Sequence, residues 1–222
     1  MPPTKLYFAT TDIIRDEADF QRLYLSASPQ RRLKVDKFRK SEDKKLSLLA
    51  EYLLRFALKE EGITSYSIIK GDHGKPFLEN ENIFFNLSHS GNVCICAVSD
   101  NEVGCDVEKI EKANMKVAKR FFSPEEFKAL ENADESERDD LFFRIWTMKE
   151  SFIKAVGTGL GMALDSFSVE LSADTPLISY STDTRAFKLK EYNLLDGYKI
   201  SLCSLNGDFS EAVEVTEIQI QI

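Results

Sequence analysis

The sequence predicts an α+β fold made of two similar halves. A strand, then helices, then further strands can be followed twice along the 222 residues, and the two series divide near residues 100–103. The length allows one large domain or two small ones with a sizeable core. Hydrophobic residues make up 43% and charged residues 30%, the ordinary mixture of a globular protein. Residue identities do not visibly repeat, so the similarity of the halves rests on element order.

The first half is expected to hold one strand, one long helix and three further strands. Residues 5–10 are typical of a strand. Apolar side chains recur at helical spacing over residues 41–59, which predicts an amphipathic helix that ends before Gly62. Turns that contain glycine, asparagine and aspartate separate three more expected strands, at residues 66–70, 83–88 and 93–99.

The second half opens with a strand and continues with helices. Apolar and polar residues alternate over 103–108, the period of two expected of a strand with one buried face. Ser123, Pro124 and Glu126 mark a helix start, because serine caps, proline suits the first helical position and Glu126 completes a capping box. A long helix is expected over 137–156, ended by the glycines that follow. The remaining expected strands are 167–171, 186–193 and 198–204.

Charge and hydropathy argue against two classes of partner. A net charge of −8 argues against broad nucleic-acid binding, which needs a clustered positive surface. No stretch approaches the roughly 20 apolar residues that span a bilayer, and the first residues lack the apolar stretch of a secretory signal. We therefore expect no membrane association and a cytoplasmic location. A local anion site stays open, because basic residues gather at Arg31, Arg32, Lys34, Lys37, Arg39 and Lys40.

The four cysteines are interpreted as reduced thiols in the core rather than as disulfides or a zinc site. Cys94 and Cys96 alternate along an apolar run, so they should share one face of a strand. The other two are Cys105 and Cys203.

Two groups of charged residues are candidates for chemistry. Asp106 and Glu108 lie about 6 to 7 Å apart along one face of the expected strand, so both carboxylates can converge on one hard cation such as Mg²⁺. The alternative is a solvated strand edge. Glu150 and Lys154 share a helix face, where they can serve as a metal ligand or base and as a phosphate-neutralising cation. The alternative is an exposed helical ion pair.

A third group lies at the end of an expected strand. Ser88, His89 and Ser90 place two hydroxyls around one of only two histidines. Such a cluster can bind phosphate through hydroxyl, imidazole and backbone amide groups. The alternative is a polar turn in which His89 makes a local hydrogen bond.

These groups belong to three segments that closely resemble the signatures of 4′-phosphopantetheinyl transferases, specifically the long, surfactin-synthetase-activating type. The segments are Asn-Leu-Ser-His-Ser at 86–90, Val-Gly-Cys-Asp-Val-Glu at 103–108 and Arg-Ile-Trp-Thr-Met-Lys-Glu-Ser-Phe-Ile-Lys at 144–154. A single Asp-x-Glu would be trivial, but three segments in the correct order and spacing are highly specific. The resemblance can be followed over residues 26–205, most of the chain.

The resemblance implies a fold and a reaction. The fold is a monomeric pseudo-dimer in which residues 1–102 contribute to coenzyme A binding, residues 103–222 carry the metal and catalytic residues, and the active site lies at the interface. The reaction moves the 4′-phosphopantetheine group of coenzyme A to a serine of an acyl or peptidyl carrier protein and releases 3′,5′-ADP. Mg²⁺ is the expected metal, with Mn²⁺ as an alternative, and the carrier and the tolerance for acylated coenzyme A stay open.

The resemblance also implies individual roles. Asp106, Glu108 and Glu150 are expected to hold the metal, and Glu150 also to help deprotonate the incoming serine. Lys154 is expected to contact the phosphates and stabilise the departing 3′,5′-ADP. The catalytic residues are thus Asp106, Glu150 and Lys154. Coenzyme A contacts are expected at Arg31, Lys34, Ser88, His89, Lys75 and Lys154, with His73 beside the nucleotide where the family often has an aromatic residue.

One position departs from the family pattern. An arginine commonly stands near the start of the first long helix, and this chain has Leu46 there, after Lys44 and Lys45. Lys45 is expected to supply the lost charge, and Ser47 the hydroxyl that usually follows.

A carrier-docking segment is expected after the metal strand. Lysines and an arginine alternate with apolar residues between 109 and 121, a pattern that suits charge pairs and apolar contacts with an acidic carrier helix. An ordinary amphipathic connector is the alternative. Two rival functions are another Mg²⁺-dependent enzyme of phosphoryl transfer or pyrophosphate cleavage and a catalytically silent carrier-binding module. Retention of the three acids and Lys154 argues against the silent module. Trp146 is interpreted as a core aromatic.

Overall fold

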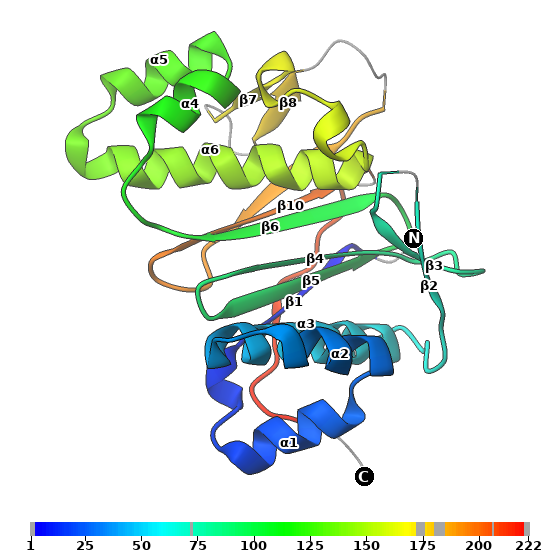
Figure 1. Ribbon diagram of the computed structural model, residues 1–222. Helices are drawn as coiled ribbons and strands as arrows, with labels where there is room; N and C mark the ends of the chain where they lie inside the picture. Colours follow the sequence, from blue (N-terminus) through cyan, green and yellow to red (C-terminus); the bar gives the residue numbers. More distant parts are fainter. Residues whose placement is uncertain (1–2, 72, 172–175, 180–184, 206, 220–222) are drawn as a thin grey trace.

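The computed structural model describes residues 3–71, 73–171, 176–179, 185–205 and 207–219. It has four layers: helices cover the outer face of each of two sheets, and the two sheets face each other in the middle (Figure 1). One sheet and its helices come mainly from the first half of the chain, and the other sheet and its helices come from the second. The predicted α+β class in two similar halves is confirmed.

The first half forms a sheet with the strand order β11-β1-β5-β4. Strand β1 pairs antiparallel with β5, β5 pairs antiparallel with β4, and the short β11 comes from the end of the chain to run parallel to β1. The helices and strands of this half are β1 (Lys5–Thr10), α1 (Glu17–Ser26), α2 (Pro29–Lys37), α3 (Ser41–Glu60), β2 (Ile68–Lys70), β3 (Pro76–Leu78), β4 (Phe84–Ser90), β5 (Val93–Ser99) and the joining β11 (Val213–Glu214).

The second half forms an antiparallel sheet with the strand order β6-β10-β9. A separate pair of short strands, β7 and β8, lies in the same half. Its helices and strands are β6 (Val103–Lys109), α4 (Met115–Phe121), α5 (Pro124–Asn132), α6 (Glu135–Val156), β7 (Ser168–Glu170), β8 (Leu177–Ser179), β9 (Lys188–Tyr192) and β10 (Tyr198–Ser204).

The described residues form four apolar cores, and three of them follow directly from this layering. One packs the inner face of α3 on β1 and β5. The second fills the space between the sheets, where Leu6, Phe8 and Ile95 meet Val107 and Leu202 from the other half. The third packs α6 on β9 and β10. The core between the sheets contains side chains from both halves, so each half depends on the other for burial of this apolar surface. Burial of apolar side chains is the main stabilising term in folding, and we therefore expect the two halves to fold as one unit.

The long helices lie close to the residue ranges predicted from the sequence. The expected helix over 41–59 is α3, and the expected helix over 137–156 is α6. Ser123 and Glu126 form the predicted capping box, and Gly157 ends α6 in the left-handed region at φ 81°. Three helices, α1, α2 and α4, were not predicted, and the expected strand over 66–70 is reduced to β2.

The expectation of a single buried face on β6 is wrong. All residues from Val103 to Val107 are buried, because α6 covers one face of the strand and the first sheet covers the other. Gly104 permits this close packing: a Cβ added there would lie 2.1 Å from the Ser151 carbonyl oxygen and 2.3 Å from the Ala155 nitrogen. Strand β6 can therefore lie directly against the backbone of α6.

The cysteines agree with the sequence-based interpretation. All four cysteines are free and buried, and burial raises the pKa of the Cys105 thiol to about 12. None of the described helices is long and apolar enough to span a bilayer. Trp146 is half-buried and stacks on Phe142 with 6.1 Å between ring centroids, so it belongs to the aromatic core of the second half as predicted.

Candidate active site

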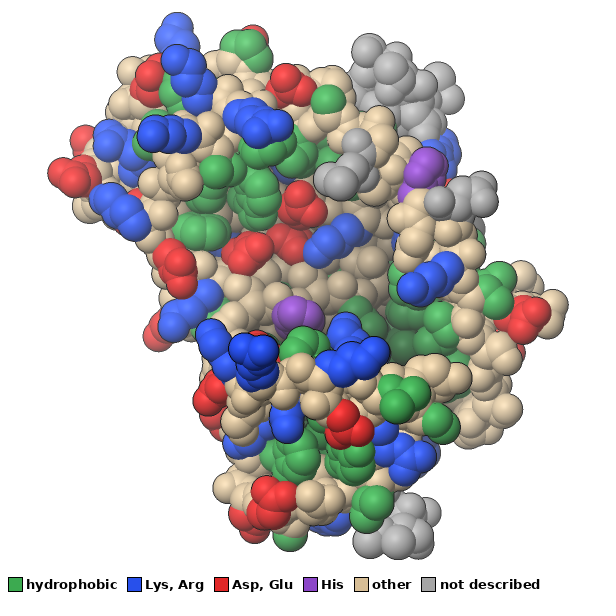
Figure 2. All heavy atoms as spheres, in the orientation of Figure 1, with side chains coloured by type: hydrophobic (Ala, Val, Ile, Leu, Met, Phe, Trp, Pro, Cys, Tyr) green, Lys and Arg blue, Asp and Glu red, His purple; other side chains and the backbone are tan. Residues whose placement is uncertain are grey.

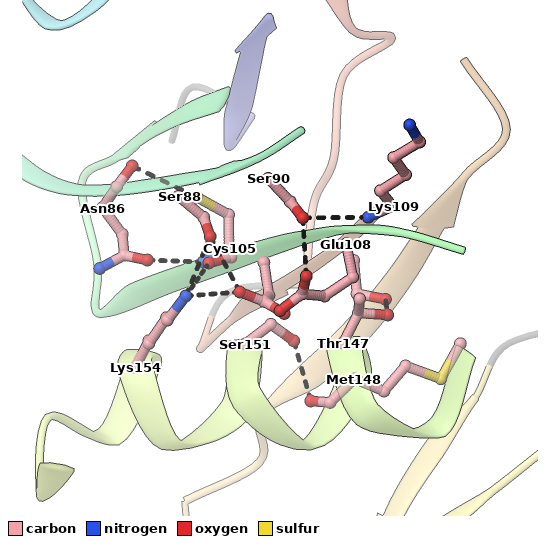
Figure 3. A network of polar contacts seen from close by, with 12 residues as sticks. Asn86, Ser88, Ser90, Cys105, Glu108, Lys109, Thr147, Met148, Ser151 and Lys154 are labelled. Atoms are coloured by element: carbon pink, nitrogen blue, oxygen red, sulfur yellow. Dashed lines mark hydrogen bonds and ion pairs between the residues drawn. The ribbon is translucent and has the colours of Figure 1, made fainter. Parts of the chain in front are cut away.

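The two halves meet along strands β4 and β6, which lie side by side (Figure 3). Every second side chain of β4 contacts β6. Asn86 Oδ1 accepts a hydrogen bond from the Cys105 nitrogen at 2.9 Å, Ser88 Oγ donates to Asp106 Oδ1 at 2.9 Å, and Ser90 Oγ donates to Glu108 Oε2 at 2.8 Å. We call this row of contacts the β4–β6 seam. It fixes both carboxylates of β6 from the opposite half.

Asp106 lies at the centre of the seam and is 3% exposed. Its Oδ1 atom pairs with the Lys154 ammonium at 2.5 Å, while Oδ2 is buried and has no hydrogen-bond partner among the described residues. Burial raises the pKa of Asp106, and the Lys154 charge opposes that rise. The alternative interpretation of Asp106 as a solvated strand position is therefore wrong, because α6 and β4 enclose it.

Glu108 and Glu150 complete an acidic group. Burial raises the pKa of both carboxyls, and the negative charge of Asp106 raises each further. The Glu150 charge also acts on Glu108, so each of the three carboxyls is in the electrostatic field of another. The alternative interpretation, an exposed ion pair between Glu150 and Lys154, is wrong. Lys154 forms its ion pair with Asp106 instead.

The acidic group fits a hard divalent cation. Three carboxylates, one of which has an unpartnered buried oxygen, are the kind of donor set that Mg²⁺ prefers, with phosphate and water as further ligands. Among the described residues, however, no three such side chains are already drawn together as a closed metal cluster.

A basic group faces the acids from the first half. Arg31 on α2 donates to Ser47 Oγ on α3 at 3.2 Å and to Glu51 Oε2 at 3.1 Å. His89 projects from β4 on the side opposite to the seam serines, and its pKa is lowered by burial and by the charges of Lys34, Lys154 and Arg31. Figure 2 shows acidic side chains in the hollow between the halves and basic side chains on the rim over α2 and α3.

Lys45 does not join the basic group. Its ammonium donates to the Ile14 carbonyl at 3.2 Å, beside the start of α1. Positions two apart on a helix point in nearly opposite directions, so Lys45 and Ser47 leave α3 on different sides. The expectation that Lys45 replaces the missing arginine charge at the coenzyme A site has no support from this geometry.

A cavity of about 430 Å³ extends from Glu150 to the far end of α6. Its wall includes Glu150 and Lys154, the segment His73 to Pro76, Gly157, Gly159 and residues 162–165. The Lys75 ammonium donates to the Val103 and Ala155 carbonyls at 3.0 Å each, and burial lowers its pKa to about 8. Lys75 thus fastens the cavity wall to β6 and α6.

Sequence reasoning missed two sets of residues. The first is the seam itself: Asn86 and Ser90 were seen only as neighbours of Ser88 and His89, although the serine–histidine–serine alternation could have indicated two faces. The second is a buried ion pair between α5 and α6, where Lys149 Nζ lies 2.7 Å from Glu126 Oε2 and donates to the Phe167 carbonyl at 2.6 Å. That network ties α5, α6 and β7 together behind the acids.

Comparisons with known proteins agree with this geometry. The 4′-phosphopantetheinyl transferase superfamily pattern matches residues 102–203, and the pattern named 4′-phosphopantetheinyl transferase, N-terminal, matches residues 15–101. The chain is 34% identical to the 4′-phosphopantetheinyl transferase Sfp of Bacillus subtilis, over 97% of this chain and 98% of that protein. It is 31% identical to the 4′-phosphopantetheinyl transferase gsp of Aneurinibacillus migulanus, over 93% of this chain and 87% of that protein.

Among solved structures, a holo-(acyl-carrier-protein) synthase of Bacillus anthracis is 21% identical, with a TM-score of 0.41 over 46% of this chain and 92% of that chain. The two family patterns and the nearly full-length relatives carry the assignment. This chain belongs to the 4′-phosphopantetheinyl transferase superfamily.

Proposed function

We propose that this chain transfers the 4′-phosphopantetheine group of coenzyme A to a serine of an acyl or peptidyl carrier protein and releases 3′,5′-ADP. The observation that carries the proposal is the nearness of an acidic group from the second half to a basic group from the first: Lys154, which pairs with Asp106, also acts on His89 together with Lys34 and Arg31. Cations are needed to bind a diphosphate and carboxylates to hold a metal and accept a proton. Family membership supports the same reaction.

The reaction exchanges one phosphorus–oxygen bond for another. The serine oxygen bonds to the phosphorus on the pantetheine side, the bond from that phosphorus to the bridging oxygen breaks, and the electron pair stays with 3′,5′-ADP. Little covalent work is left to the protein, so positioning and charge neutralisation dominate. Lys154 is placed to neutralise the charge that develops on the departing oxygen, because it lies at the junction of the acids and the cavity.

Glu150 is the proposed acceptor of the serine proton. It lines the cavity on α6, and burial together with Asp106 raises its pKa. A carboxylate with a raised pKa is a stronger base at neutral pH, which suits a group that must take a proton from a hydroxyl. The metal, for which we propose Asp106, Glu108 and Glu150 as ligands, would supply positive charge beside the diphosphate.

In this proposal the basic group binds phosphate of coenzyme A, and the cavity wall lies beside its nucleotide. Arg31, Lys34 and His89 would bind phosphate, and Ser47 orients Arg31. Burial and the neighbouring cations lower the pKa of His89, which favours the neutral imidazole as a hydrogen-bonding partner, whereas a bound phosphate would favour the charged form. The segment with His73 and Lys75 would form the wall beside the nucleotide.

The proposed carrier-docking surface lies on α4 and the loop before it. Its basic residues, Lys109, Lys112, Lys116, Lys119 and Arg120, are all exposed. Its apolar residues are less available, since Met115, Val117 and Phe121 pack against the core of the second half. Docking would therefore rest mainly on charge, and Arg120 and Phe121 link this surface to the cavity.

Release of the nucleotide product tests the function. The protein would be incubated with coenzyme A, MgCl₂ and an apo carrier protein, and 3′,5′-ADP would be separated and quantified by chromatography. We expect one nucleotide per carrier and no release with a carrier whose acceptor serine is replaced by alanine. Release independent of the serine would instead favour a pyrophosphate-cleaving enzyme, and carrier binding without release would favour a silent binding module.

A further inference from the structure

The Lys154 ammonium is held by three acceptors. It lies 2.5 Å from Asp106 Oδ1, 3.1 Å from Ser88 Oγ and 3.3 Å from the Cys105 carbonyl oxygen. An ammonium group has three donors, so these contacts satisfy it completely. Figure 3 shows Lys154 reaching from α6 into the seam between β4 and β6. The lysine is thus docked on the acidic group rather than extended into the cavity.

The ion pair with Lys154 occupies Asp106, the central carboxylate of the proposed metal site. Asp106 is the most deeply buried of the three acids, and the pair with Lys154 is the ion pair it makes among the described residues. Glu108 and Glu150 raise the total to three negative charges around one ammonium. The lysine therefore supplies part of the positive charge that a metal would otherwise bring to the same carboxylate.

We propose that the Lys154 ammonium and a divalent cation compete for Asp106, and that the diphosphate of coenzyme A ends this competition by drawing Lys154 away. The second part rests on the function proposed above. A cation bound to Asp106 would lie within a few ångströms of the ammonium, and like charges at that distance repel strongly in a partly buried site. The diphosphate oxygens offer Lys154 equivalent acceptors, and its flexible four-carbon stem can swing without moving α6.

A binding linkage follows. If coenzyme A strengthens metal binding by removing a competing ammonium, the metal must strengthen coenzyme A binding by the same factor. Metal and coenzyme A would then bind cooperatively, and the metal site would be weak until the substrate arrives. Lys154 would act as an internal place-holder for the metal in addition to its role toward the leaving group.

Metal binding measured without turnover tests the proposal. Mn²⁺ would be titrated into the wild-type protein and Lys154→Met, with and without coenzyme A and without carrier, and free Mn²⁺ followed by electron paramagnetic resonance. We expect Lys154→Met to bind Mn²⁺ alone about tenfold more tightly than wild type. We also expect coenzyme A to strengthen Mn²⁺ binding clearly in wild type and much less in the variant.

Lys34→Met is the matched control, because it removes a cation close to His89 that makes no ion pair with the three acids among the described contacts. Its affinity for Mn²⁺ alone should stay within about twofold of wild type. Equal or weaker Mn²⁺ binding by Lys154→Met, with an unchanged circular dichroism spectrum, would overturn the proposal. So would equal tightening in both variants, which would indicate a general charge effect.

The two proposals fail separately. Wild-type protein that releases 3′,5′-ADP in the carrier assay, combined with no tightening in Lys154→Met, would remove the competition and leave the function standing. Tighter Mn²⁺ binding by Lys154→Met alone, combined with no effect of coenzyme A on wild type and no nucleotide release, would preserve the competition and overturn the function.

Discussion

At the residue scale, the site combines burial with unbalanced charge. Three carboxyl groups have raised pKa values because they are buried near one another, and one ammonium pairs with the most buried of them. Such perturbed groups cluster at functional sites, where residues are selected for chemistry at a cost in stability. Replacing one of these carboxylates should therefore reduce activity, and removing its charge can raise stability; the two predictions below test one effect each.

The first prediction concerns Asp106→Asn. The amide keeps the shape of the side chain but removes the charge that pairs with Lys154 and that the proposed metal requires. We expect turnover, measured as 3′,5′-ADP release, to fall by about 100-fold or more. Asp196→Asn, at an exposed turn position, is the control and should keep wild-type turnover. Full activity of the Asp106 variant would remove this residue from the site.

The second prediction concerns pH and Glu108→Gln. A carboxyl whose pKa is raised on folding binds its proton more tightly in the native state, so stability falls as pH rises from the unfolded pKa, 4.5, through the folded value. The amide stays neutral and can still accept the Ser90 hydrogen bond. The variant should therefore melt at a higher temperature than wild type at pH 7.5, with the difference shrinking toward pH 4.5. A pH-independent difference would contradict this explanation.

At the element scale, the site depends on how closely β6 lies against α6. Gly104 is the contact point, and Asp106 and Lys154 pair only because the strand and helix backbones approach there. The buried Lys149–Glu126 pair fixes the opposite side of the same helix. Two independent anchors thus hold the face of α6 that carries Glu150 and Lys154.

Gly104→Ala tests the close approach. The added methyl would lie 2.1 Å from the Ser151 carbonyl oxygen, so strand and helix must separate. We expect a loss of about 1 to 3 kcal/mol in the free energy of unfolding by chemical denaturation, together with reduced turnover. Gly161→Ala is the matched control, since nothing lies within 4 Å of its added Cβ and its φ is not positive. Equal stability of both variants would show that the contact does not constrain α6.

The elements also show what the sequence could predict. Helices α3 and α6 were predictable because both are long and glycines stand where they end, and α3 also has a clear apolar periodicity. Helices α1 and α2 were missed although Asp16 and Ser28 cap them, because they are only 10 and 9 residues long and offer few turns in which a periodic pattern can be seen. The burial of both faces of β6 was not predictable, since alternation describes one strand and not what covers it.

At the scale of the whole molecule, the two halves build the site together. The acids come from β6 and α6, while the basic group comes from α2 and β4. The family resemblance named most of these residues as members of one site, and their individual roles stay predictions. Position-by-position matching could not show that Lys45 turns to Ile14, because the direction of a side chain depends on the neighbouring helices.

Carrier docking is the prediction at this scale. The protein carries a net charge of −8, so an acidic carrier must approach a local basic surface. Lys112→Glu combined with Lys116→Glu should raise the KM for the carrier several-fold, more strongly at low salt, and leave the KM for coenzyme A unchanged. Lys37→Glu combined with Lys59→Glu makes the same charge change on the helices of the first half and is the control. An unchanged carrier KM in the first variant would exclude this docking surface.

The most direct test of the central claim is the intact mass of an apo carrier protein after incubation with this protein, coenzyme A and Mg²⁺. The proposed function predicts a gain of one phosphopantetheine group, abolished by a chelator and by Glu150→Gln. No gain across acyl, aryl and peptidyl carriers, despite measurable coenzyme A binding, would contradict the proposed transferase function.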